Sequence, residues 1–182
     1  MTVSPYLDTL LLLVVTAAAI KDLECRRIPN RLLLAGVLGA LVLHVFSPQP
    51  LRALLLAVAG AATGLLIFLP FYLVRGMAAG DVKMMAAVGA FTGPGDALRI
   101  AILAWCVGGV MALAIVIVKG RLRLAVSNLW AIVRPTLLRL PPGPALGSPD
   151  GPPSAGSIPY GVAIALGTIG FLASRYGPMP LF

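Results

Sequence analysis

Six acidic residues stand out in a chain of 182 residues that is 59% hydrophobic and only 11% charged. An acidic side chain in so apolar a sequence is costly unless it faces a polar cavity or a partner. Two of the six, Asp22 and Asp81, border apolar runs. If these carboxylates approach each other, repulsion makes them share a proton. One could then take a proton from water while the other polarises a carbonyl group, which is the chemistry of aspartic proteases.

Other uses of the two acids remain open at this point. Asp81 could cap the helix that follows it, with Lys83 as a counter-charge. Asp22 would end a helix, where its charge opposes the helix dipole unless a neighbouring cation pairs with it. Two carboxylates alone make a poor transition-metal site, so we expect no metal and no bound cofactor. The only histidine, His44, is expected at the other end of its helix as a packed or interfacial residue.

The elements that position these acids are apolar runs of the sequence, separated by polar or Pro/Gly-rich breaks. A bilayer core requires about 20 mostly apolar residues per helix. We therefore expect an all-α fold, a polytopic integral membrane protein with about six transmembrane helices in a single domain over residues 1–182. The runs are 4–20, 31–46, 51–74, 84–92, 97–118 and 158–174.

The basic residues predict the orientation of these helices. Eleven of the 14 Lys and Arg residues fall after the first, third and fifth runs. Because positive charge favours the cytoplasmic side, those loops are predicted to be cytoplasmic and both termini to lie on the outer side. This topology brings Asp22 and Asp81 to the same, cytoplasmic face.

The remaining acids have simpler interpretations. Asp8 is expected at the outer end of the first helix, and Asp96, in the turn TGPGD, is expected to be a turn residue or a helix cap. Glu24 follows Asp22 by two residues and would point to the opposite side if the helix continues. Asp150 is predicted to be a solvated residue of a linker.

The longest cytoplasmic segment divides into two parts. Residues 119–140 mix Arg with apolar side chains and predict a basic helix lying in the membrane interface. Residues 141–157 are rich in Pro and Gly and predict an extended linker. The net charge of +8 is spread between apolar runs, so membrane lipids rather than nucleic acid are the expected counter-charge.

Three segments, in this order, resemble the motifs of type IV prepilin peptidases, the membrane aspartic peptidases of the GxGD type. They are DLECRRIPN at 22–30, GDVK at 80–83 and IPYG at 158–161. The small size most resembles the tight-adherence (Flp) pilus branch. The resemblance implies an endopeptidase of the bacterial cytoplasmic (inner) membrane. Its substrate would be a prepilin or prepilin-like protein, from which it removes the leader peptide at the cytoplasmic face.

The resemblance carries the two catalytic aspartates of the family onto Asp22 and Asp81. Gly80 matches the motif glycine directly before the second aspartate. Ala78 occupies the position of the other motif glycine, and alanine can replace glycine only where the backbone avoids positive φ. The four-cysteine zinc loop linked with N-methylation in larger relatives has no counterpart here, so methyltransferase activity is not implied. The resemblance also assigns substrate-binding or site-shaping roles to Gly80, Lys83, Pro29, Asn30, Pro159, Tyr160 and Gly161.

A rival hypothesis is a non-catalytic membrane component of pilus assembly or secretion, or a small transporter. Such a protein would use the two acids as an ion-pair or solute site. It predicts that Asp22 and Asp81 lie apart, or that Asp81 pairs with Lys83 or Arg75.

Overall fold

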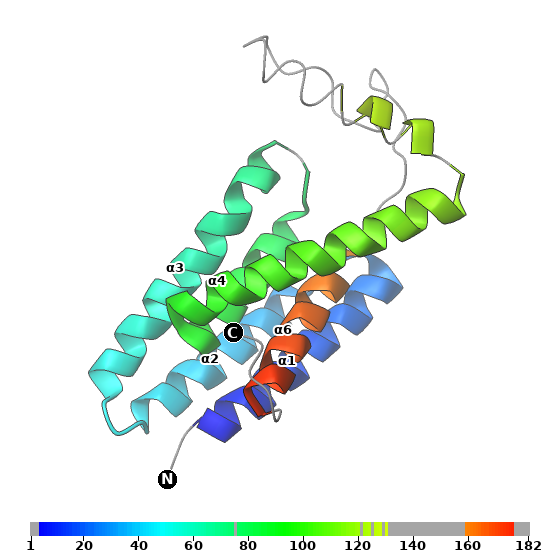
Figure 1. Cartoon of the computed structure of the whole chain (residues 1–182). Helices are drawn as coiled ribbons and strands as arrows, with labels where there is room; N and C mark the ends of the chain where they lie inside the picture. The colour runs from blue at the N-terminus through cyan, green and yellow to red at the C-terminus, as the bar shows by residue number, and fades with distance from the viewer. Residues whose placement is uncertain are drawn as a thin grey trace. The chain divides into compact units, whose positions relative to one another are not determined.

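A computed structural model of the chain is helical throughout the part that it describes, with no strand among those residues (Figure 1). This confirms the predicted all-α class. The structure describes residues 4–74, 76–120, 122–124, 126–128, 130 and 159–176. By its internal contacts the chain divides into two compact units, one made of Met1–Gly108 and Pro159–Phe182, the other of Gly109–Ile158.

The helices coincide with the predicted apolar runs. α4 contains two of those runs, joined across a kink at Gly93, whose φ of 80° and ψ of 174° are not helical. Pro94 follows the kink, so the predicted TGPGD turn is a sharp change of direction within one element. The helices are α1 (Ser4–Cys25), α2 (Asn30–Val45), α3 (Pro50–Leu73), α4 (Ala79–Val118) and α6 (Tyr160–Tyr176).

Two of the described helices, α3 and α4, are long and apolar enough to cross a membrane, and α2 is a shorter apolar helix. Their outward side chains are apolar, as expected for helices surrounded by lipid. Leu55, Val58 and Leu66 of α3, for example, are all more than half exposed. The number of membrane crossings and the sides of the two termini stay predictions.

The core of the larger unit lies between α1, α6 and both arms of α4, the first arm being residues 79–92 before the kink, with Phe68 of α3 also fully buried. α1 packs against both α2 and α6, and α2 packs against α3. Figure 1 shows α1 and α6 side by side along their lengths. Fully buried side chains from the three helices include Leu11, Val15, Met84, Met85 and Ile164.

Glycines bring α3 and the first arm of α4 into backbone contact. A Cβ atom on Gly89 would overlap the carbonyl oxygen of Gly60, and one on Gly64 would overlap that of Met85. Such small-residue contacts allow helices to associate closely in an apolar environment. They fix the arm of α4 that carries Asp81.

We predict that Gly89→Ala destabilises the protein by about 1–3 kcal/mol, because neither backbone can yield without separating the helices. The measurement is the thermal unfolding midpoint in detergent micelles. Gly95→Ala is the matched control on the same helix, since a Cβ there meets nothing within 4 Å. An unchanged midpoint for Gly89→Ala would contradict the close contact.

The second unit contains the end of α4 and the described part of the predicted interfacial helix. Residues 122–124 and 126–128 are helical, and Leu122, Val126 and Trp130 are all more than half exposed. Their spacing of four residues places these apolar side chains on one side of a helix. Contact of this segment with lipid stays a prediction. Residues 131–140 and the predicted linker at 141–157 lie outside the described residues.

Candidate active site

Asp22 lies in the last turn of α1 and is only 7% exposed. The helix ends at Cys25, and Arg26 adopts a left-handed conformation with φ 53°. The Arg26 N–H donates to the Asp22 carbonyl at 3.0 Å, which closes the helix as the chain turns away. The Asp22 carboxylate is thereby held at the end of the helix, facing the interior.

The Asp22 carboxylate is bound by the start of α6. The Gly161 N–H donates to Asp22 Oδ2 at 2.9 Å. The first N–H groups of a helix have no acceptor within that helix and carry its positive dipole end. The sequence suggested that the negative charge of Asp22 is destabilised by the helix dipole, because Asp22 lies at the C-terminus of α1. In the structure the N-terminus of α6 offsets that disadvantage.

Asp81 lies in the first turn of α4 and is 6% exposed. Its Oδ2 accepts the Ala78 N–H at 3.3 Å, and its own N–H donates to the Ala78 carbonyl at 3.1 Å. The bond from the Ala78 N–H to the Asp81 side chain is one half of a capping box, made from the third residue of α4. Among the non-glycine residues that the structure describes, only Arg26 has a positive φ. Ala78 is therefore compatible with this turn.

The segments carrying the three predicted motifs meet around these two acids. Asp22 accepts the N–H of Gly161, which follows Tyr160 in the third motif, and Asp81 follows Gly80 in the second motif. The Ile28 side chain lies against both motif glycines. A Cβ on Gly80 would lie 3.5 Å from Ile28 Cβ, and one on Gly161 would lie 3.1 Å from Ile28 Cδ1. The two buried carboxylates thus share one neighbourhood.

Lys83 and Asn30, from the second and first motifs, also meet. Lys83 Nζ donates to Asn30 Oδ1 at 3.2 Å. Lys83 was considered as a counter-charge for Asp81, and the structure instead directs its ammonium group to an amide at the start of α2. Pro29 occupies the N-cap position of α2, and Pro159 is buried just before α6. These side chains frame the site without neutralising Asp81.

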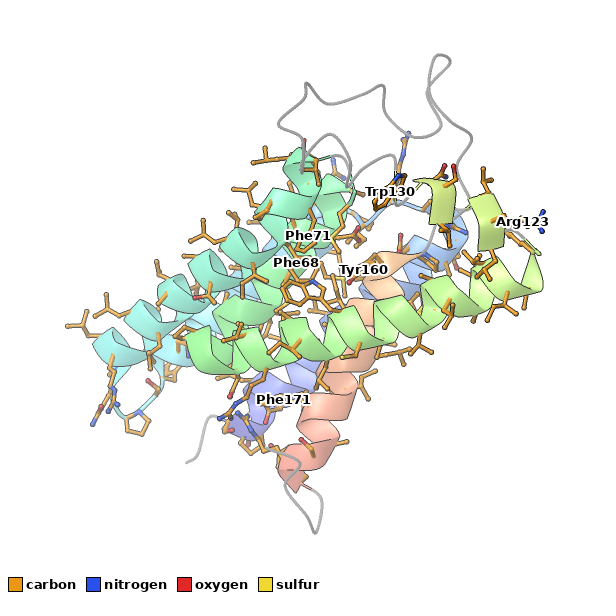
Figure 2. The ribbon with its side chains drawn as sticks, turned by 45° about the horizontal axis from the view of Figure 1, so that its top comes forward. Phe68, Phe71, Arg123, Trp130, Tyr160 and Phe171 are labelled. Carbon is orange, nitrogen blue, oxygen red and sulfur yellow. The ribbon has the colours of Figure 1, made fainter. Side chains whose placement is uncertain are left out.

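Three aromatic side chains grouped with the predicted Tyr160 were missed from the sequence, because an aromatic residue in an apolar run carries no sign of its neighbours. Phe68 lies 6.1 Å from Trp105 and 6.0 Å from Tyr160, and Phe71 lies 5.5 Å from Trp105, between ring centroids. Figure 2 shows Phe68, Phe71 and Tyr160 gathered together. Trp105 Nε1 is buried without a hydrogen-bond partner among the described residues. An unsatisfied buried donor costs about 1–3 kcal/mol.

The other acids lie elsewhere. Glu24 pairs with Lys21 at 2.8 Å on the exposed side of α1, which confirms that it points away from Asp22. Asp8 and Asp96 are more than an interfacial residue and a turn residue, because both form ion pairs with Arg175, at 3.5 Å and 2.6 Å. Asp150 lies outside the described residues.

His44 is packed within the larger unit, as predicted. It is 8% exposed, and its Nε2 lies 3.1 Å from the Ala90 carbonyl oxygen. Among the residues that the structure describes, no group of three or more His, Cys, Asp and Glu side chains could hold a metal ion.

The fold and the site define a helical protein with long apolar helices and two buried carboxylates at helix ends. The model of the type IV leader peptidase family matches residues 9–113, more than half of the chain, and the chain belongs to this family. The matched residues include Asp22 and Asp81 but end before Pro159, and the match does not distinguish the tight-adherence branch. No curated protein and no solved structure matches the chain. Together with the apolar helices, the family indicates a membrane peptidase that acts on prepilin-like substrates.

Proposed function

We propose that the chain is a membrane-embedded aspartic endopeptidase that removes the leader peptide of type IV prepilins or prepilin-like proteins. Asp22 and Asp81 would be its catalytic pair, working at the cytoplasmic face of the bacterial inner membrane. One observation carries the proposal: Ile28 lies against both Gly161, whose N–H binds the buried Asp22 at 2.9 Å, and Gly80, which directly precedes the buried Asp81. The rival function, a scaffold or transporter, predicted a pair of Asp81 with Lys83 or Arg75. Lys83 instead donates to Asn30 at 3.2 Å, and Arg75 lies outside the described residues.

The two carboxylates differ in their surroundings, which supports distinct roles. Asp22 accepts an N–H group at the positive end of α6, an arrangement that stabilises negative charge. Two buried acids that act on each other hold one proton between them. We therefore assign the role of the base to Asp22 and the role of the acid to Asp81.

In the proposed reaction, the Asp22 carboxylate takes a proton from a water molecule while the water oxygen bonds to the scissile carbonyl carbon. Asp81 gives its proton to the carbonyl oxygen, so a neutral tetrahedral intermediate forms. Asp22 then returns its proton to the leaving nitrogen as the carbon–nitrogen bond breaks. Asp81 recovers its proton from the intermediate as the new carboxyl group forms, and the pair regains its starting state.

The neighbours of the pair are suited to holding an extended substrate. Tyr160 and Asn30 are proposed to position the leader junction, and the buried Trp105 Nε1 offers an unused donor for a substrate carbonyl. The substrate's apolar helix would lie along the apolar surface of the enzyme. Its basic leader would then remain on the cytoplasmic side.

The direct test is co-expression of this chain with a prepilin in a bacterial host that lacks its own prepilin peptidase. We expect the mass of the prepilin to fall by that of its leader, with a new N-terminus just before the apolar helix. A matched prepilin without its apolar helix should remain uncut. If the chain accumulates in the membrane and tested prepilins of several branches all keep their leaders, the proposed function is wrong.

A further inference from the structure

α6 is attached to α1 at both of its ends. At one end the Gly161 N–H donates to Asp22 Oδ2 at 2.9 Å. At the other end, Arg175 Nη1 donates to Asp8 Oδ1 at 3.5 Å and the Tyr176 hydroxyl donates to Asp8 Oδ2 at 2.5 Å. Figure 2 shows Tyr160 and Phe171 toward the two opposite ends of α6.

These two attachments match in spacing. Asp8 and Asp22 are fourteen residues apart, and so are Gly161 and Arg175. At a rise of about 1.5 Å per residue, each pair spans about 21 Å of helix. Because α1 and α6 are antiparallel, Asp8 and Asp22 face their partners Arg175 and Gly161 at equal separations along the two helices. A slide of α6 along α1 would break the contacts at both ends. The two attachments together define the axial register of α6.

Arg175 is bound by two carboxylates rather than one. Its own side chain is 37% exposed, but the Asp8 side chain is only 11% exposed, and Arg175 also reaches Asp96 Oδ2 at 2.6 Å. The Arg175 guanidinium lies 5.4 Å from the centroid of the Phe171 ring, which restrains it further. Through these contacts Arg175 joins α1, α4 and α6. The same three helices carry Asp22, Asp81 and Gly161 at their other contact.

The register matters for the candidate active site because of where Gly161 lies. Its N–H is in the first turn of α6, where no carbonyl of the same helix can accept it. Its contact with Asp22 therefore depends on how α6 is placed along α1. The Gly161 backbone lies directly against the carboxylate, since a Cβ there would be 2.9 Å from Asp22 Oδ2.

We propose that Arg175, acting through Asp8, is a positioning residue that sets the register in which the Gly161 N–H binds Asp22. This inference rests on the proposed function for its effect on catalysis, but the register itself can be measured without any substrate. Arg175 does not touch the reacting atoms. It acts by holding the far end of α6.

The experiment compares Arg175→Gln with Arg99→Gln in the full chain. Arg99 also pairs with Asp96, at 3.3 Å, but within α4, so its loss removes an ion pair without releasing α6. We expect Arg175→Gln to lower kcat for leader cleavage about tenfold with KM unchanged, less than the about hundredfold that a 1 Å misplacement can cost. Arg175→Lys should restore most of kcat, and Arg99→Gln should resemble the wild type.

Hydrogen exchange provides the readout that needs no cleavage. In detergent micelles, the amides at the start of α6 should exchange faster in Arg175→Gln than in Arg99→Gln or the wild type. If Arg175→Gln does not accumulate, Tyr176→Phe removes one bond to Asp8 without removing a charge and should accelerate exchange in the same segment. Unchanged exchange, or equal effects of the two arginine variants, would overturn the inference. Wild-type protein that cuts no prepilin would instead count against the proposed function.

Discussion

Asp22→Asn and Asp81→Asn are each expected to abolish leader cleavage, lowering the rate by at least about a thousandfold. Asparagine has nearly the shape of aspartate but can neither accept a proton from water nor deliver one to a carbonyl oxygen. In the Asp22→Asn variant the amide oxygen could still accept the Gly161 N–H, so the helix contact need not be lost. The measurement is the fraction of co-expressed prepilin that retains its leader, determined by mass.

The matched control for these variants is Glu24→Gln. Glu24 lies two residues from Asp22 on the same helix but pairs with Lys21 on the exposed surface. This variant should cleave as the wild type does, which separates the loss of a catalytic acid from the loss of a negative charge nearby. Full cleavage by either asparagine variant would exclude a mechanism that requires both carboxylates. Membrane accumulation of all three variants ensures that the comparison concerns chemistry.

The helices of this chain could be predicted closely from hydropathy. A lipid-exposed segment must satisfy its backbone polar groups internally, so an apolar run in a membrane protein is a helix. The run predicted at 31–46 is Asn30–Val45, and the run at 158–174 is Tyr160–Tyr176. The break predicted between residues 92 and 97 is the kink at Gly93, since a positive φ followed by a proline cannot continue a helix.

The hydropathy pattern could not predict which residues of the site contact each other. The bond between Gly161 and Asp22 joins residues 139 apart in the sequence, and an apolar run does not reveal which side of it faces a given neighbour. The resemblance supplied Gly161 as a motif residue but not its role as a donor to Asp22. In the same way, Asp8 was predicted as a single interfacial residue, because its partner Arg175 lies 167 positions away.

The contact between Gly161 and Asp22 predicts a steric effect that distinguishes the two motif glycines. In Gly161→Ala the new methyl group would lie 2.9 Å from Asp22 Oδ2 and 3.1 Å from Ile28 Cδ1. The first distance is too short and the second is tight, so the Asp22 carboxylate must move away from the N-terminus of α6. We expect leader cleavage to fall about a hundredfold, because displacing a reacting group by about 1 Å has an effect of that size. The measurement is the initial rate of cleavage in isolated membranes.

Gly80→Ala should cost much less, although Gly80 directly precedes the second aspartate. A methyl group there meets Ile28 at 3.5 Å, an ordinary van der Waals distance, and Gly80 has no positive φ that alanine could not adopt. Gly170→Ala, on the open side of α6, controls for the added methyl group itself. If Gly80→Ala were as damaging as Gly161→Ala, the flexibility of the motif loop would matter more than the space beside Asp22. A much larger loss at Gly161 would instead mean that the N-terminus of α6 is as much a part of the catalytic arrangement as the two acids. This helix lies outside residues 9–113, the part of the chain that the family model matches.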